Sequence, residues 1–530
     1  MSLPYLQPYL GLSNGLNTLH AAGGGGGAVG GWKELGRTTL GSTGDDMVVS
    51  GITSKRYYMV LANLAPLTHD VTIYSRLGDS VVDTGSNYSS RSYDPSLGYD
   101  STYTSRTNMV MHTGAGTTNV SGFEVGYIAN YVTKEKLWIN HTVNNSSNGA
   151  GNAPHRSEGV SKWANTSNEA RIISYNNYGS GSFEPGCELI VLGYDPLDTE
   201  TGGFWQELAS VELGGTADEI SSGTISAKKY LWVQAWFKAS GDTNQAVQFN
   251  NDTSGNYANR GSYDGGADGT STSSAYAIAN YGSAMNTSCF MNMFIINNAS
   301  TEKLVICHIV DQEASGAGTA PHRQEQVGKW ANTSNQITEI DIKNTDTGDY
   351  TSGSEVVVLG YDPADTHTTN FWQELASVDL SGGASSTLDS GTFTAKKYLW
   401  VQAYLKSTSN TLNTRVQLNN DTGSNYSYRG SGNGGSDFSG APSTKFIGDF
   451  NGGFITAEFF NGFIINNAST EKLGIFYNNE SLTAGAGTAP NRIEICGKWA
   501  NTSNQITSIQ FINSPNNYAT VSRLKVWGAD

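Results

Sequence analysis

The feature of this chain that most constrains its fold is a long internal repeat. The heptapeptide KWANTSN begins at Lys162, at Lys329 and again at Lys498. Other motifs recur around it in a fixed order, among them FWQEL, AKKYLWVQA, FIINNASTEKL and GAGTAP, with weaker counterparts in the first copy. Matching points lie about 167 residues apart, which is the size of a domain and far longer than a solenoid repeat. The sequence therefore predicts three tandem domains of related structure.

The positions of the motifs set the expected boundaries. We expect a divergent first repeat at residues 32–196, a second repeat at 197–363 and a closely related third at 364–530. Residues 1–31 differ from all three, because spaced Tyr and Leu residues precede a glycine-rich hinge. We interpret them as an anchor that inserts into a partner; the alternative is a frayed terminus or a strand that pairs with the first domain. The anchoring residues would be Tyr5, Leu6, Tyr9, Leu10 and Leu12.

Each repeat has the sequence pattern of an all-β domain. KKYLWVQAWF alternates two kinds of apolar residue, and SEVVVLGY is an apolar run of strand length. Gly, Asn and Asp interrupt such runs at short intervals, as turns require. A domain of about 165 residues with many short strands suits a two-sheet sandwich. The predicted fold is all-β: three tandem jelly-roll-like β-sandwich domains behind an extended N-terminal segment.

Composition excludes several classes of partner. The formal net charge of −16 argues against nucleic acid and against anionic lipid. No apolar run is long enough to span a membrane, and the N-terminus lacks the pattern of a secretory signal. No Cys or His spacing indicates zinc, so we expect no cofactor and no metal. We expect the four cysteines, which do not occupy equivalent repeat positions, to be free buried thiols: Cys187, Cys289, Cys307 and Cys496.

The tryptophan of KWANTSN is the first residue type for which a role can be predicted. It stands at Trp163, Trp330 and Trp499, each followed by the turn-forming residues NTSN. We expect a core tryptophan at a strand end, followed by a hydrogen-bonded turn. The alternative is an exposed tryptophan that stacks on a sugar ring.

A second repeated cluster follows the sequence NNDT. Asp252 precedes Arg260, and Asp421 precedes Arg429, with a counterpart in the first copy. We expect each aspartate to pair with its arginine and hold the loop by charge-assisted hydrogen bonds. A calcium site is the alternative, although a single carboxylate beside an arginine does not favour a cation.

The motif KKYLWVQAWF has two faces, and the aliphatic face is expected to lie in the core. The other face carries aromatic residues that we expect to form an interface, either with a second sheet or with a neighbouring subunit. A platform for glycan is the alternative. These residues are Tyr230, Trp232, Trp236, Tyr398, Trp400 and Tyr404.

Catalysis finds little support in the sequence. None of the eight histidines falls at the same position in all three repeats; His155 and His322 match, but Asn491 replaces them in the third. No nucleophile elbow, metalloprotease helix or phosphate loop is present. We therefore predict no enzyme and no catalytic residue. The neighbouring charges Glu302–Lys303 and Glu471–Lys472 are expected to be solvated turn charges.

The ordered motifs FWQELASVEL, AKKYLWVQA, FNNDTSGNYANRGS, FIINNASTEKL, GKWANTSNQIT and SEVVVLGYDP resemble a β-rich module of tailed-phage virion structural proteins, particularly marine ones. The resemblance covers all three repeats and implies a non-enzymatic protein of the virion surface: a capsid decoration, a head fibre or a tail fibre. Residues 1–31 would attach it to other virion proteins. Self-assembly into a homo-oligomer, such as a trimer, and contact with a host-surface glycan would follow by analogy. The alternatives are a lectin-like tandem and a cell-surface adhesin or envelope-layer protein.

Overall fold

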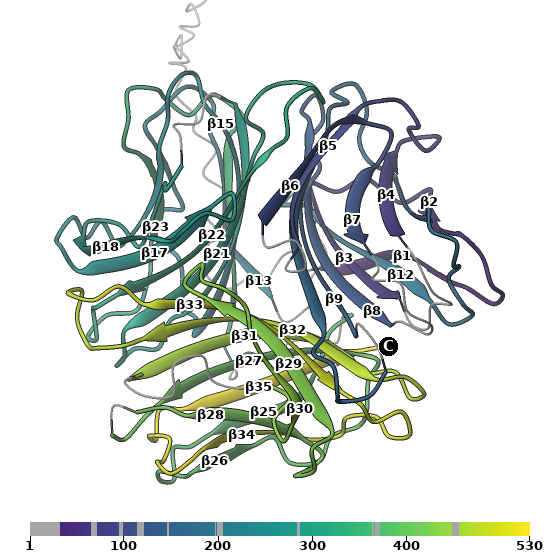
Figure 1. Ribbon diagram of the computed structural model, residues 1–530. Helices are drawn as coiled ribbons and strands as arrows, with labels where there is room; N and C mark the ends of the chain where they lie inside the picture. The colour runs from purple at the N-terminus through teal and green to yellow at the C-terminus, as the bar shows by residue number, and fades with distance from the viewer. Residues whose placement is uncertain are drawn as a thin grey trace, which may run out of the picture.

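The computed structural model describes residues 32–64, 72–94, 99–113, 121–145, 148–196, 198, 205–282, 287–362, 365, 371–409, 411–447 and 455–530. The expected anchoring residues of segment 1–31 lie outside these ranges. The described residues form 35 β-strands, which confirms the prediction of an all-β chain. They build three β-sandwiches in tandem, each with one large and one small antiparallel sheet (Figure 1).

The first repeat contains strands β1 to β12. Its large sheet has the order β1 (Lys33–Thr39), β12 (Glu188–Tyr194), β3 (Tyr57–Leu64), β8 (Gly122–Ala129), β9 (Lys136–Asn144), β10 (His155–Trp163), β5 (Tyr88–Asp94) and β6 (Tyr99–Arg106). Its small sheet has the order β2 (Asp46–Ser50), β11 (Ile172–Asn177), β4 (Thr72–Gly78) and β7 (Met109–Thr113).

The second repeat reproduces this topology with strands β13 to β24. Its large sheet has the order β13 (Gln206–Glu212), β24 (Glu355–Tyr361), β15 (Tyr230–Lys238), β20 (Ser288–Ile296), β21 (Lys303–Asp311), β22 (His322–Trp330), β17 (Tyr257–Tyr263) and β18 (Gly269–Ser274). Its small sheet has the order β14 (Glu219–Ser221), β23 (Ile340–Asn344), β16 (Gln245–Phe249) and β19 (Ile278–Ala279).

The third repeat follows with strands β25 to β35. Its large sheet has the order β25 (Gln373–Asp379), β35 (Arg523–Ala529), β27 (Tyr398–Lys406), β31 (Ala457–Ile465), β32 (Lys472–Ser481), β33 (Asn491–Trp499), β29 (Tyr426–Gly432) and β30 (Phe438–Ser443). Its small sheet, in the described residues, has the order β26 (Thr387–Asp389), β34 (Ile509–Asn513) and β28 (Thr414–Leu418).

Strand β15 shows how the alternating sequence serves two cores. Leu231 and Val233 point between the two sheets of their own sandwich, in a core cluster made only of second-repeat residues. Trp232 and Trp236 point to the opposite side of the large sheet, into a cluster that contains residues of all three repeats. The large sheet is therefore buried on both faces, which explains why both sets of alternate positions in this strand are apolar.

The three large sheets face a common centre, and Figure 1 shows the three sandwiches arranged around it. We call the line through this centre the axis. Two of the three pairs of repeats share the same stack: Trp32 stacks on Trp232 with ring centroids 4.8 Å apart, and Trp205 stacks on Trp400 at 5.3 Å. Phe123 of the first repeat packs on Tyr398 of the third, so the contacts close into a ring. The three sandwiches of one polypeptide thus form a closed ring around a shared core, and we call this ring the head.

We call the contact between two repeats a seam. Strands β12, β24 and β35 are equivalent, and the first residue of each differs between repeats. Glu188 of the first repeat accepts a hydrogen bond from Tyr398 Oη of the third at 2.8 Å. Glu355 of the second accepts one from Tyr131 Oη of the first at 2.5 Å. The third repeat has Arg523 at this position, where its strand β35 begins. The three equivalent positions therefore differ in residue type, and the two glutamates make different contacts.

Candidate functional site

The tryptophan of the KWANTSN motif is buried in every repeat. Trp163, Trp330 and Trp499 are each 1% exposed, so they offer no face to a sugar. Each indole N–H donates to the aspartate of the preceding loop; the acceptors are Asp83 at 2.7 Å, Asp252 at 2.7 Å and Asp421 at 2.8 Å. The first asparagine of NTSN caps the following turn by accepting two backbone N–H groups, as expected.

The expected aspartate–arginine pair within each loop is wrong. Asp252 accepts hydrogen bonds from the Trp330 indole, from Asn256 and from the backbone of Ser254. These donors occupy both carboxylate oxygens, so the loop is held without a cation. The arginines instead reach the next repeat around the axis, where they donate to the proline carbonyl of the GAGxAP motif: Arg91 to Pro321, Arg260 to Pro490 and Arg429 to Pro154, at 2.8–2.9 Å.

The lysine of KWANTSN also crosses a seam between repeats. Its ammonium is buried and donates to backbone carbonyls of the neighbouring repeat: Lys162 to Gln312 at 2.8 Å, Lys329 to Thr483 at 2.6 Å and Lys498 to Asn145 at 2.9 Å. The motif therefore joins two repeats, with its tryptophan fixed in one and its lysine bound to the other.

The expectation that Glu302–Lys303 and Glu471–Lys472 are solvated turn charges is wrong. Lys303 and Lys472 are fully buried and donate to nearby backbone carbonyls. The glutamates accept the first backbone N–H of the GAGxAP motif of a neighbouring repeat. Gly485 donates to Glu302 at 2.5 Å and Gly149 donates to Glu471 at 2.6 Å. Both residues of each pair are thus used in folding or in closing the ring.

The aromatic face of the long strands lies entirely inside the shared core. The six residues are 0–1% exposed: Tyr230, Trp232, Trp236, Tyr398, Trp400 and Tyr404. Trp232 and Trp400 also donate their indole N–H to Asn292 and Asn461 at 2.7 and 2.9 Å. These residues form the interface between repeats of one chain and leave no platform for glycan. The uncovered surface that favoured a homotrimer is covered by the chain itself, and the oligomeric state stays a prediction.

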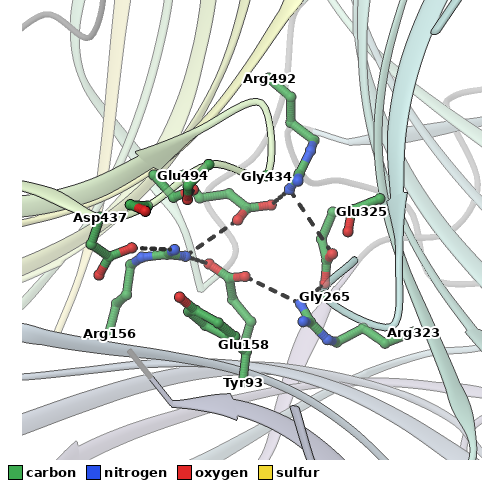
Figure 2. Close-up of a pocket in the computed structure, with 14 residues that line it drawn as sticks. Tyr93, Arg156, Glu158, Gly265, Arg323, Glu325, Gly434, Asp437, Arg492 and Glu494 are labelled. Carbon is green, nitrogen blue, oxygen red and sulfur yellow. Dashed lines mark hydrogen bonds and ion pairs between the residues drawn. The ribbon is translucent and has the colours of Figure 1, made fainter. Parts of the chain in front are cut away.

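The strongest candidate for a site is a charged pocket on the axis, with a volume of about 360 Å³ (Figure 2). Equivalent positions of β10, β22 and β33 each contribute an arginine and, two residues later, a glutamate on the same face of the strand. The six side chains are buried, and Figure 2 shows their charged ends directed toward one another. They are Arg156, Glu158, Arg323, Glu325, Arg492 and Glu494.

The arginines and glutamates alternate around the axis. Each arginine pairs with the glutamate of its own repeat. Each also approaches a glutamate of another repeat: Arg156 lies 3.2 Å from Glu494, Arg323 lies 3.2 Å from Glu158, and Arg492 lies 3.9 Å from Glu325. An aspartate of a neighbouring repeat accepts a hydrogen bond from Nη2 of each arginine; these aspartates are Asp437, Asp100 and Asp268.

The pKa values of the three axial carboxyl groups are shifted in different directions. Burial raises the pKa of Glu158 well above its usual range, opposed by Arg156 and reinforced by Glu494. Burial likewise raises the pKa of Glu325 to about 7, against the attraction of Arg323. For Glu494 the effect of burial is outweighed by Arg492, Arg156 and a hydrogen bond from Glu158, so its pKa is lowered. Burial and the neighbouring Glu494 thus favour the neutral form of Glu158, whereas the arginines favour the ionised form of Glu494.

A layer of aromatic rings lies beside this charged layer. His141, His308 and Tyr477 stand opposite Glu158, Glu325 and Glu494 in the strand registers. Their ring centroids are 4.4–4.6 Å apart. Burial lowers the pKa of His308 to about 4 and holds that of His141 well below its usual range, so both imidazoles are neutral near pH 7.

Sequence reasoning missed the charged pocket, although its signal is visible. The pattern Arg-x-Glu follows the GAGxAP proline by two residues in all three copies, as HRSE, HRQE and NRIE.

The four cysteines are free and buried, as predicted. No helix among the described residues is long and apolar enough to cross a membrane.

Comparisons with known proteins add no family. No protein-family model and no curated protein matches the chain. Domains LG4-5 of the mouse laminin alpha1 chain align with 62% of this chain and 91% of their own, at 8% identity and a TM-score of 0.13. The outer membrane channel DcaP of Acinetobacter baumannii aligns with 82% of this chain and 97% of its own, at 11% identity and a TM-score of 0.08. The attachment invasion locus protein Ail of Yersinia pestis aligns with 54% of this chain and 99% of its own, at 5% identity and a TM-score of 0.10. Likenesses this weak carry no argument.

Proposed function

We propose that the chain is a non-enzymatic structural protein of a virion surface, as a capsid decoration, a head fibre or a tail fibre. The observation that carries the proposal is the closure of three repeats into one head around a shared aromatic core. The lysines, arginines and glutamates of the repeated motifs hold the ring closed, because they form hydrogen bonds between neighbouring repeats. A closed head with a shared apolar core is expected to resist unfolding, which suits a particle that must persist outside a cell.

Residues 1–31 have the role of particle anchor in this proposal. Their sequence has spaced Tyr and Leu residues followed by a glycine-rich stretch, which is the composition of an apolar segment joined to a domain by a linker. The three sandwiches would then project from the particle and present their outer surfaces to the host. Contact with a host glycan would have to use those outer surfaces, because Trp232, Trp400 and their neighbours are buried.

Gold-labelled antibody imaging of particles tests the proposal. An antibody against the full chain would be applied to particles released from a culture that expresses it. Gold on heads supports a capsid decoration or head fibre, and gold on tails supports a tail fibre. Gold on cell envelopes beside unlabelled particles would overturn the proposal in favour of an adhesin or envelope-layer protein.

The anchor can be tested separately with a chain that begins at residue 32. That chain retains every described strand, so we expect the circular dichroism spectrum and the melting temperature of the full chain. We also expect it to stay in the supernatant when particles are sedimented, whereas the full chain sediments with them. Co-sedimentation of the shortened chain would show that the sandwiches themselves bind the particle.

A further inference from the structure

The axial pocket is a cavity whose mouth reaches the surface of the head. Its volume of about 360 Å³ lies within the range of small-ligand sites, about 300–1,000 Å³. Gly265, Gly435 and Ser436 line the pocket and are exposed. A small molecule can therefore reach the arginines and glutamates of the pocket from solvent.

The charged side chains of the pocket bind one another and still have hydrogen-bonding capacity left. A guanidinium has five N–H groups, and hydrogen bonds among the described residues use three of them in each axial arginine. Three buried atoms of pocket-lining side chains have no hydrogen-bond partner in the described part of the chain: Nε of Arg156, Nε of Arg323 and Oδ2 of Asp437. Buried polar groups are costly when unpaired, so a ligand that offers both donors and acceptors would be stabilised here.

The charges around the pocket favour a neutral ligand over an ion. Three glutamates and three aspartates surround three arginines, so carboxyl groups outnumber guanidinium groups and repel an anion. Every axial glutamate is already paired with a buried arginine, which opposes a cation. A hydroxyl group can donate to a carboxylate and accept from a guanidinium. A neutral molecule with several hydroxyl groups therefore fits the alternating order of charges.

Tyr93 gives one side of this polar pocket an apolar wall. In the strand registers it stands opposite Glu158, where the other repeats place Ser262 and Ser431 opposite their own glutamates. Its ring centroid lies 5.2 Å from Cζ of Arg156. A sugar has an apolar face of C–H groups and a rim of hydroxyl groups. It can therefore contact an aromatic ring and hydrogen-bond to neighbouring charged groups at the same time.

We propose that the axial pocket binds one neutral sugar of the size of a mono- or disaccharide. Tyr93 contacts the sugar ring, and the axial arginines and carboxyl groups bind its hydroxyl groups. The site goes beyond the structural role proposed above, which requires no ligand. Because the tyrosine is present in only one of the three equivalent positions, the pocket is asymmetric and holds the sugar in one orientation.

The test is saturation-transfer difference NMR with the purified full chain, which detects magnetisation passed from a protein to a bound sugar. The probes are glucose, galactose, mannose and N-acetylglucosamine, each titrated separately. Tyr93→Ser removes the ring and has a precedent in the other two repeats, and Ser436→Trp places a bulky side chain at the mouth of the pocket. Tyr178→Ser is the matched control, because Tyr178 is 56% exposed and follows strand β11 of the small sheet.

Wild type and Tyr178→Ser are expected to bind at least one of these sugars with equal affinity. Tyr93→Ser should bind it about 2–10-fold more weakly, and Ser436→Trp should not bind it. Absence of binding between wild type and every probe, or equal binding by all the variants, would overturn the site. Loss of binding in Tyr178→Ser alone would place the sugar on the outer surface and would equally overturn it.

Circular dichroism of each variant separates loss of the site from loss of the fold. The titration uses the purified chain without particles, so its result does not depend on whether the protein belongs to a virion or to a cell envelope.

Discussion

Trp232 of the second repeat lies flat against Trp32 of the first, with ring centroids 4.8 Å apart and an interplanar angle of 11°. Trp232 is fully buried, and its indole N–H donates to Asn292. The contact joins residues 200 positions apart in sequence (232 − 32 = 200) and belongs to a core that no single repeat contains.

Removal of this ring should destabilise the head strongly. Trp232→Ala leaves a large cavity at the seam, and we expect a loss of about 3–5 kcal/mol in the free energy of unfolding. Val81→Ala is the control, because Val81 is 73% exposed and its loss should cost about 0.5 kcal/mol or less. Urea unfolding of both variants measures the difference. Equal effects would mean that the seam contributes little.

The shared core predicts that the three repeats unfold together. Residues of each repeat supply part of the central cluster, so melting one repeat exposes apolar surface on both others. Differential scanning calorimetry should show one transition whose calorimetric and van't Hoff enthalpies agree. Three resolved transitions would show that the sandwiches are independent.

The seam lysines should be more important to stability than exposed lysines. Lys329 is fully buried and donates to the carbonyl of Thr483 in the next repeat. Lys329→Met leaves that carbonyl without a donor, and we expect a cost of about 1–3 kcal/mol. Lys343→Met is the matched control: Lys343 pairs with half-exposed Glu219, and such pairs contribute about 0–1 kcal/mol. Chemical unfolding of the two variants distinguishes them, and similar losses would contradict the role of Lys329.

A buried acid in the first repeat should make stability fall as pH rises. Burial raises the pKa of Glu124 to about 8, although a hydrogen bond from Tyr175 partly opposes this. Its contribution is complete below the ordinary pKa of 4.5, because both states then hold the proton. Between that value and about 8 the unfolded chain releases the proton and the folded chain keeps it. Stability should therefore fall by about 1.4 kcal/mol per pH unit from this group.

The second repeat suggests the variant that removes this effect. Met291 and Ile342 stand where the first repeat has Glu124 and Tyr175. The double substitution Glu124→Met with Tyr175→Ile should be more stable than wild type, by a margin that grows between pH 5 and pH 8. Urea unfolding at several pH values measures the margin. A constant difference across that range would show that Glu124 does not titrate as predicted.

The sequence was sufficient for the fold class because its signals are local. Alternation in KKYLWVQAWF places Leu231 and Trp232 on opposite faces of a strand, and the order of the motifs indicates three domains. The same alternation shows that both faces of the strand are apolar. It does not identify what covers the second face, which in this chain is the rest of the chain.

The site could not be predicted in the same way, because its partners are brought together only by closure. Asp252 and Arg260 are close in sequence, yet one binds Trp330 in its own repeat and the other binds Pro490 in the next. Glu158 and Glu494 meet across more than half the chain. Charged residues with partners in another domain resemble solvated surface charges when only their sequence neighbours are considered.

The different residues at the three seams have a consequence for how the molecule can vary. A symmetric homotrimer repeats every substitution three times, so it cannot place an acid at one seam and a base at another. This chain has Glu188, Glu355 and Arg523 at equivalent positions, because each is encoded separately. Because Glu188 and Glu355 are buried, this difference lies inside the molecule: each seam has its own charge, and a substitution at one seam leaves the other two unchanged.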